Sequence, residues 1–497
     1  MIPSDIDDDD PRVLRSWATE PDFYQCPMPP LDGKAFSPYQ HAGVEYCLAR
    51  DHAIIGDEPG VGKTAQGVGL SNAVRAKKTL VIAPASLRLN WEREIWTWSN
   101  IENVTTYPVM KASDGISTKA DFVIISYDLL NNGAIFDAIK EQRWDHLILD
   151  EAHAIKDPKG NKRSVAICSD LDGIKNVCGR YTLLTGTLTP NQPIEAYQAI
   201  RLVNWDAIDR ASLESFRKFY YAEGGGMVRS PVQKVNEKTG QVYTVSELHW
   251  SNTVRNQPRN LDDLHNRLRK HVMTRRLKSQ VLKDLPAKRW HPFPLAMTAD
   301  IKRALQRPEW KAAERLYDMN PEAFHQAVPV DGAISTARLE LGLAKAPSIV
   351  DYVDQLLDEG IEKLVVGGWH REVLTILRQA FEKYGCCFMD GRTNDRTKQD
   401  EVDRFQNDPR VRIFLGQMIP LGKGWTLTVA QDAVLAEPYW VPGENDQFLD
   451  RLHRRGQLGS VTGHIPVVPG TLDEKILGTA IAKDKHINLT LDGGRRG

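Results

Sequence analysis

Several features that would place the chain in a specialised class are scarce. Only six of its 497 residues are cysteine, and no two of them form a Cys-x-x-Cys pair. A zinc site or a disulfide framework is therefore not expected, and the chain fits a reducing compartment. The sequence also has no apolar run of about 18 residues, so we expect no membrane-spanning helix.

An excess of charge of one sign is missing as well. The formal net charge is −1, which excludes a general attraction to nucleic acid and leaves any such binding to local basic patches. The N-terminus has an acidic run, Asp7–Asp10, and no apolar segment, so it does not resemble a secretory signal. We expect residues 1–34 to be a flexible acidic lead-in. The length allows about two to four domains.

Residues 56–64, Gly-Asp-Glu-Pro-Gly-Val-Gly-Lys-Thr, lie between a short apolar run and a helix-compatible stretch. Strand, loop and helix in this order are the setting of a phosphate-binding loop. Glycines can adopt positive φ, which turns successive N–H groups towards an anion. Lys63 would contact the β- and γ-phosphates of ATP, and Thr64 would offer its hydroxyl to Mg²⁺. The expected nucleotide-binding residues of this loop are Pro59, Gly60, Val61, Gly62, Lys63 and Thr64.

The loop departs from the general pattern at one position, because Asp57 stands where that pattern has glycine. Upstream, Gln40 lies in a stretch with helical spacing of apolar residues. An amide offers both donors and an acceptor, so we interpret Gln40 as the residue that reads the adenine edge. The expected cofactors are ATP and Mg²⁺.

Short, nearly continuous apolar runs alternate with helical patterns in both halves of the chain. We predict strands over 53–55, 79–84, 122–127, 146–150, 181–185, 363–367, 387–389, 411–415, 433–435 and 465–468. Such strands are typical of parallel sheets covered on both faces. The sequence therefore predicts an α/β fold with two parallel-sheet domains, and ligands in such folds bind at the carboxyl ends of the strands.

The residues at these strand ends suggest chemistry. Asp150 is placed to hold Mg²⁺ together with Thr64, and Glu151 to orient or deprotonate the attacking water. Two adjacent carboxylates at a strand end would otherwise be read as a helix cap. Polar groups at two further strand ends suit a nucleic-acid backbone, although each is equally consistent with an ordinary turn. These candidate DNA contacts are Pro84, Ser86 and Ser126.

The middle of the chain breaks this rhythm. Residues 226–245 predict a β-hairpin, which would act either as a wedge at a DNA junction or as an inert surface excursion. Residues 261–285 predict a basic helix, and its cations Arg275, Arg276 and Lys278 are candidate DNA contacts. Near the other end, Arg451 and Arg454 are spaced to share one helix face. Two guanidinium groups there would neutralise charge on the γ-phosphate during transfer.

These motifs, taken in order, resemble a known family. Gln40, the 60–64 loop, Asp150-Glu151-Ala152-His153 and Thr185-Gly186-Thr187 are similar to the first motor domain of a superfamily 2 helicase. Residues 57–64 resemble the SWI/SNF-type double-stranded DNA translocases, which usually carry Met at the position of Pro59. The segment from Arg275 to Lys288 is most similar to the HepA-related annealing helicases.

The second half carries the same resemblance. Asp390-Gly391-Arg392-Thr393 is similar to the family's strand-binding motif, and residues 420–428 to its coupling motif. The resemblance adds Gly391, Arg392, Thr393 and Gly422 to the DNA-binding candidates, and Gly424 to the nucleotide-binding ones. The run Gln447-Phe448-Leu449-Asp450-Arg451-Leu452-His453-Arg454 matches the arginine-finger motif and adds Gln447 to the catalytic set of Lys63, Asp150, Glu151, Arg451 and Arg454.

The resemblance implies two RecA-like motor domains with helical insertions. We expect the first at 35–205, an insertion at 206–285, a linker and helical protrusion at 286–350, the second motor domain at 351–482 and a tail at 483–497. It also implies an ATP-dependent motor on duplex, forked or branched DNA, acting as a monomer. The expected location is the cytoplasm of a bacterium or virus-infected cell, or the nucleus of a eukaryote. A strand-separating helicase, an RNA-dependent ATPase and a hydrolysis-dead scaffold remain as alternatives.

Overall fold

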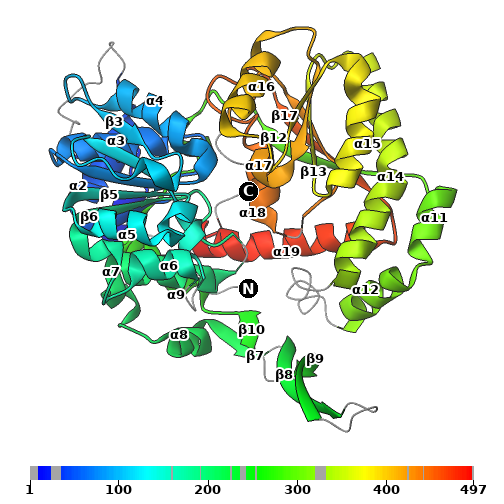
Figure 1. Ribbon diagram of the computed structural model, residues 1–497, viewed down its shortest axis with the longest axis horizontal. Coiled ribbons are helices and arrows are strands. Elements are labelled where there is room, and N and C mark those ends of the chain that lie inside the picture. Colours follow the sequence, from blue (N-terminus) through cyan, green and yellow to red (C-terminus); the bar gives the residue numbers. More distant parts are fainter. Residues whose placement is uncertain are drawn as a thin grey trace.

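Two parallel β-sheets, each covered by helices, make up the computed structural model of the protein (Figure 1). It describes residues 9–23, 35–157, 161–190, 192–223, 226–235, 242–251, 255–319, 332–421, 425–439 and 441–494. The first lobe is coloured mainly blue to green in Figure 1, and the second begins in green with β12 and continues through yellow to orange. The predicted α/β fold with two parallel-sheet domains is confirmed.

The first sheet has seven parallel strands in the order β11-β1-β6-β5-β2-β4-β3. They are β1 (His52–Ile55), β2 (Thr79–Ala83), β3 (Thr106–Pro108), β4 (Phe122–Ser126), β5 (Trp144–Asp150), β6 (Cys178–Leu184) and β11 (Met273–Thr274). Along β2, Leu80 and Ile82 face one apolar cluster, whereas Val81 and Ala83 face another. Since both faces are covered, such a strand is apolar at nearly every position, which is the pattern that the sequence showed.

Helices and short 3-10 turns carry the chain between these strands. The helices are α2 (Pro38–Leu48), α3 (Lys63–Ala73), α4 (Arg88–Trp98), α5 (Gly133–Lys140), α6 (Lys162–Cys168), α7 (Tyr197–Asn204), α8 (Leu213–Tyr220) and α9 (Leu261–His271). The turns nearest to the site are η2 (Ala85–Leu87), η4 (Tyr127–Asn131), η5 (Ala152–Ile155) and η7 (Pro193–Ala196). Each of these turns follows the carboxyl end of a strand or lies close to one, so together they line one edge of the sheet.

The second sheet has six parallel strands in the order β12-β17-β16-β13-β15-β14. They are β12 (Lys288–Pro294), β13 (Leu364–Gly368), β14 (Cys386–Met389), β15 (Ile413–Gln417), β16 (Asp432–Leu435) and β17 (Val461–Val467). Its helices are α11 (Ala299–Leu305), α12 (Pro308–Met319), α14 (Gly332–Asp358), α15 (Arg371–Phe381), α16 (Asp395–Asn407), α17 (Met418–Leu421) and α18 (Pro442–Leu449). All ten predicted strands are present in the two sheets.

Strand β12 shows that the expected boundary at 286–350 was wrong at its start. Residues expected to form a linker instead pair along seven positions with β17 at the edge of the second sheet. An edge strand tolerates prolines and polar side chains, so Pro292 and Pro294 hid this strand from a search for apolar runs. The helices expected in the rest of that range are confirmed by α11, α12 and α14.

The range 206–285 also differs from expectation. The basic helix ends at His271 rather than continuing to 285, and β11 joins the first sheet directly afterwards. The hairpin is confirmed: β8 (Gly226–Val235) pairs antiparallel with β9 (Val242–Ser251), and its turn lies outside the described residues. At its root, β7 (Tyr221–Glu223) pairs with β10 (Arg255–Pro258). In Figure 1 the hairpin projects away from both lobes.

Both ends of the described chain pack against the first lobe. Helix α1 (Pro11–Ser16) buries Val13 and Ser16, so the lead-in is not flexible at these residues. Helix α19 (Leu472–Asp492), red in Figure 1, crosses from the second lobe back beneath the first, where Leu491 joins its core. The expected tail from 483 is therefore largely helix. Among the described helices, none has both the length and the apolar character needed to traverse a bilayer.

Candidate nucleotide site and nucleic-acid cleft

The loop between β1 and α3 has the backbone of an anion cradle. Gly60 and Gly62 have φ of 87° and 84°, which glycine adopts without steric cost. Helix α3 begins at Lys63, so its positive end faces the loop. The Lys63 Nζ donates to the carbonyl oxygen of Asp57 at 2.8 Å, and burial lowers the pKa of Lys63. The loop therefore has the backbone geometry expected of a phosphate-binding loop, and Lys63 folds onto its carbonyl oxygens; phosphate binding itself stays a prediction.

The unusual Asp57 of this loop has a structural partner. Its carboxylate accepts hydrogen bonds from Arg276, through Nε and Nη2 at 3.0 Å each, and from Gln66 Nε2 at 2.8 Å. The Asp57 and Arg276 side chains are both 0% exposed. The departure from glycine thus introduces a buried ion pair that anchors the loop to the segment after β11.

Asp150 and Glu151 lie where β5 ends. Trp91 Nε1 donates to Asp150 Oδ2 at 2.8 Å, and the backbone N–H of Glu151 donates to Asp150 Oδ1 at 2.9 Å. Burial and the neighbouring Glu151 charge raise the pKa of Asp150 above its ordinary value. Burial opposes ionisation of Glu151, but the hydrogen bond to His153 and the charges of His153, Lys63 and Arg451 outweigh it and lower the pKa of Glu151. A cation beside Asp150 would relieve the crowding of negative charge.

Glu151 is held in an uncommon conformation. Its φ is 49°, in the left-handed region that side chains other than glycine rarely adopt. Its Oε2 lies 3.3 Å from Nδ1 of His153, and the same ring nitrogen lies 3.5 Å from Thr185 Oγ1. His153 therefore lies between the Glu151 carboxylate and the turn that follows β6.

The two arginines of the second lobe lie on this site. Both come after the last residue of α18, in a turn, so the expectation that they share a helix face is wrong. A Cβ placed on Gly60 would lie 3.0 Å from Cγ of Arg454, so Arg454 packs directly on the phosphate loop. Arg454 Nη1 donates to Thr426 Oγ1 at 2.9 Å. Arg451 is buried, which lowers the pKa of its guanidinium group, and the charges of Glu151 and Asp150 oppose that shift.

A further contact crosses between the lobes. Gln447 Nε2, on α18, donates to Thr187 Oγ1 at 3.1 Å. The preceding Gly186 leaves no room for a side chain, because a Cβ there would lie 2.7 Å from Pro59 of the phosphate loop. The motif at 185–187 thus touches the loop on one side and the second lobe on the other.

Gln40 lies against the phosphate loop. Its Oε1 accepts from the Ser37 backbone N–H at 2.8 Å, and its Nε2 lies 3.5 Å from the carbonyl oxygens of Val61 and Gly62. Its contact with adenine stays a prediction, as do the roles of Pro59, Val61 and Thr64. Gly422 and Gly424 lie outside the described residues.

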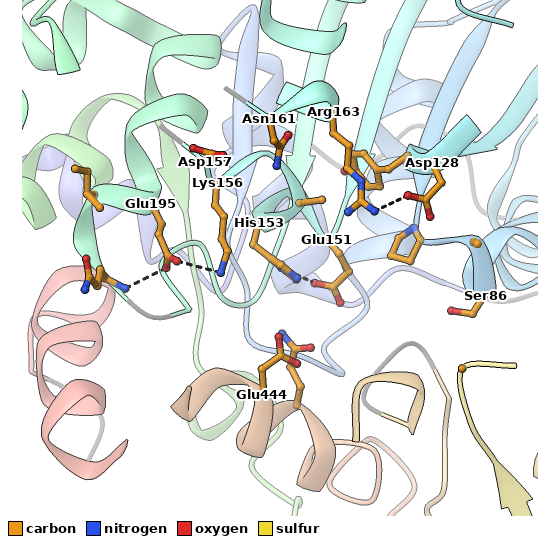
Figure 2. Close-up of a pocket in the computed structure, with 18 of the residues that line it drawn as sticks. Ser86, Asp128, Glu151, His153, Lys156, Asp157, Asn161, Arg163, Glu195 and Glu444 are labelled. Atoms are coloured by element: carbon orange, nitrogen blue, oxygen red, sulfur yellow. Dashed lines mark hydrogen bonds and ion pairs between the residues drawn. The ribbon is translucent and has the colours of Figure 1, made fainter. Parts of the chain in front are cut away.

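An open cleft of about 840 Å³ runs between the lobes and reaches Glu151 and Gln447 (Figure 2). Figure 2 shows Glu444 of the second lobe facing the first-lobe residues across it. Three predicted DNA contacts line the cleft: Pro84, Ser86 and Gly391. Three basic residues that the sequence reasoning missed also line it: Lys156, Arg163 and Lys398. Their sequence neighbourhood did not mark them: Arg163 directly follows Lys162 and Lys398 lies two residues after Arg396, but such short basic groups are common on any solvated surface.

Other predicted DNA contacts are corrected by the structure. Ser126 is buried at 3% exposure at the end of β4. Arg275 and Arg276 are at most 1% exposed, and Lys278 is 6% exposed, all beside carboxylates. Buried and paired cations have no surface left for a phosphate backbone, so these predictions were wrong. Arg392 and Thr393 stay predictions: Arg392 is exposed, and the Thr393 hydroxyl donates to Asp390 at 3.1 Å.

The fold and site together define a two-lobed protein with its phosphate loop on one lobe and facing arginines on the other. The family model of the SNF2-related domain matches residues 39–328, more than half of the chain. The chain therefore belongs to the SNF2-related family, and the resemblance drawn from its motifs is confirmed.

Two curated relatives match most of the chain. "DNA annealing helicase and endonuclease ZRANB3" of Bos taurus is 28% identical over 467 residues, covering 92% of this chain and 40% of the relative. "SWI/SNF-related matrix-associated actin-dependent regulator of chromatin subfamily A-like protein 1" of Bos taurus is 28% identical, covering 91% and 45%. The chain thus spans less than half of either relative. The solved "Sulfolobus solfataricus SWI2/SNF2 ATPase core in complex with dsDNA" has a TM-score of 0.42 and 19% identity, covering 94% of this chain and 99% of that one.

Proposed function

We propose that the protein hydrolyses ATP and couples hydrolysis to movement on duplex or branched DNA, as in fork remodelling, branch migration or strand annealing. The observation that carries this proposal is the packing of Arg454 on Gly60 of the phosphate loop. A site assembled from two lobes links the state of the nucleotide to the closure of the lobes. Because one chain supplies both halves, a monomer suffices.

Each residue of the site has a defined task in this proposal. Lys63 and the loop N–H groups hold the β- and γ-phosphates, and Glu151 accepts a proton from the attacking water. Arg451 and Arg454 neutralise the charge that spreads over the γ-phosphate, which is typically worth ~10³-fold or more in rate. Thr64 and Asp150 would hold Mg²⁺, which neutralises charge on the phosphates when bound. The hydrogen bond from Trp91 to one oxygen of Asp150 orients the carboxylate.

The cleft of Figure 2 is the proposed DNA path. The cleft is lined by residues of η2, η4 and η5 from the first lobe and by Gly391 and residues of α18 from the second. Closing the lobes would shift each wall along the backbone in turn. Lys156, Arg163 and Lys398 would contact phosphates, so binding should tolerate any sequence and weaken with salt. The names of the two curated relatives, an annealing helicase and a regulator of chromatin, support DNA as the substrate.

One observation favours strand separation as a second candidate function. The hairpin of β8 and β9 is rooted beside the cleft, because Tyr221 of β7 accepts a hydrogen bond at 2.8 Å from the backbone of the cleft residue Ile194. A projecting hairpin there would meet DNA leaving the cleft. Loss of unwinding with retained ATP hydrolysis, after deletion of residues 227–250, would identify the hairpin as a wedge. Unwinding that survives the deletion would leave it without this task.

The test of the main proposal is ATP hydrolysis with saturating duplex DNA. Lys63→Ala, Glu151→Gln and Arg454→Ala should each abolish DNA-stimulated turnover while circular dichroism shows an intact fold. Arg455→Ala is the matched control, since Arg455 is exposed in the same turn and has no task in the site. Normal turnover in any of the first three variants would refute the task assigned to that residue.

A further inference from the structure

One buried residue, Lys278, joins the phosphate loop to the turn that carries both arginines: its backbone N–H contacts the loop and its ammonium group contacts the turn. Lys278 is the first residue of α10 (Lys278–Val281) and is 6% exposed. Its Nζ donates to Asp450 Oδ1 at 2.8 Å and to the carbonyl oxygen of His453 at 2.7 Å. Its backbone N–H donates to Glu58 Oε2, in the phosphate loop, at 2.6 Å. One residue therefore contacts both halves of the nucleotide site.

The position of Lys278 is fixed from the side of the first lobe. The chain after β11 continues alongside the loop, where the Gly56 N–H donates to Thr274 O at 2.7 Å and the Glu58 N–H donates to Arg276 O at 3.1 Å. These hydrogen bonds extend the sheet pairing past the end of β1. When the phosphate loop moves, the backbone of Lys278 must move with it.

Its partners fix the second lobe. Asp450 directly precedes Arg451, and His453 directly precedes Arg454, so the ammonium group holds the backbone between the two arginines. The Asp450 and Lys278 side chains are 5% and 7% exposed. Because both side chains are buried away from solvent, a hydrogen bond between charged groups is strong and depends on precise geometry. Burial lowers the pKa of Lys278 to about 8, although the Asp450 charge opposes this. At neutral pH the ammonium form still dominates.

We propose that Lys278 is a positioning residue that holds the turn at 450–455 in register with the phosphate loop. The proposal rests on the proposed ATPase function, since its consequence is correct placement of Arg451 and Arg454 at the γ-phosphate. In this proposal Lys278 acts through the turn, because its buried Nζ is directed at Asp450 and His453. It replaces the DNA contact that the sequence suggested for this residue.

The chain offers a matched control for a substitution at Lys278. Lys345 of α14 is also buried, at 1% exposure, and its Nζ lies 2.6 Å from Asp473 Oδ2, entirely within the second lobe. Lys278→Met and Lys345→Met each remove one buried ammonium group that pairs with a carboxylate, although Asp450 also contacts Lys288, whose Nζ lies 3.0 Å from its Oδ1. Both should lower the thermal midpoint, but only Lys278→Met should also lower kcat for ATP, by ~10- to 100-fold, with KM within about twofold. Lys278→Arg retains the charge and should recover most of the loss.

A second measurement does not depend on catalysis. Backbone hydrogen exchange without nucleotide should accelerate over residues 450–457 in Lys278→Met, whereas exchange in α3 and β5 of the same variant should stay as in the wild type. In Lys345→Met, exchange over residues 450–457 should also stay as in the wild type. Unchanged exchange over 450–457 would overturn the proposal, and so would equal kcat losses in the two variants. If the wild type hydrolyses no ATP, the proposed function fails, while hydrogen exchange still decides the role of Lys278.

Discussion

Replacing Asp57 with asparagine tests the most unusual feature of the phosphate loop. Asparagine keeps the shape of the side chain but removes its charge, which leaves the fully buried guanidinium of Arg276 without an anion. Breaking a buried ion pair by neutralising one partner typically costs about 3–5 kcal/mol. For a lobe of some 250 residues, each kcal/mol shifts the midpoint by about 2–4 °C, so we expect a fall of roughly 6–20 °C.

Thermal unfolding followed by circular dichroism measures this loss. Adding Arg276→Met to Asp57→Asn removes the stranded cation, so the double variant should be more stable than Asp57→Asn alone. Asp206→Asn is the control, because the Asp206–Arg210 pair has a 2.6 Å contact but exposed side chains, and its midpoint should not change measurably. A midpoint in Asp57→Asn equal to that of the wild type would refute the anchoring role.

Two further predictions concern stability at low pH and DNA binding. Burial lowers the pKa of His146 to about 3. The neutral ring is hydrogen-bonded through Nδ1 to Ser71 Oγ at 2.7 Å and through Nε2 to Thr182 Oγ1 at 2.8 Å. The stability from this neutral ring is fully present above the ordinary pKa of 6.5 and is lost, by about 1.4 kcal/mol per pH unit, as pH falls from there towards 3. Urea titrations between pH 5 and 7 should therefore show a flatter pH dependence in His146→Gln, and an unchanged slope would contradict the reasoning. In the cleft, Arg163→Gln should weaken duplex binding for all sequences and reduce the slope of log K against log salt by about 1. Fluorescence anisotropy at several salt concentrations measures that slope, and a wild-type slope would remove Arg163 from the DNA path.

The strands, the phosphate loop and the carboxylate pair were predictable because their signals are local. A buried parallel strand is apolar at nearly every position, as β2 and β4 are apart from Thr79 and Ser126 at their ends, and a phosphate loop needs glycines next to a lysine. These patterns lie within a few consecutive residues. The order of such elements then placed Asp150 and Glu151 at the correct edge of the sheet.

The basic stretch could not be read locally. Arg275 and Arg276 look like a solvated surface patch in the sequence, yet their carboxylate partners, Asp492 and Asp57, are 217 and 219 positions away. Charge alone does not reveal whether a cation is exposed or buried beside a distant anion. Distant contacts also decide the end of α19: its last turn is helical because Ile487 and Leu491 pack into a core formed by the first lobe.

The most direct test of the central claim is steady-state ATP hydrolysis measured at one salt concentration with five additions. These are no nucleic acid, single-stranded DNA, blunt duplex DNA, a three- or four-way DNA junction, and RNA. We predict strong stimulation by duplex DNA and more by the junction, because both lobes would grip a duplex backbone along the cleft. Stimulation by single strands or RNA alone would contradict the account and identify a conventional helicase instead.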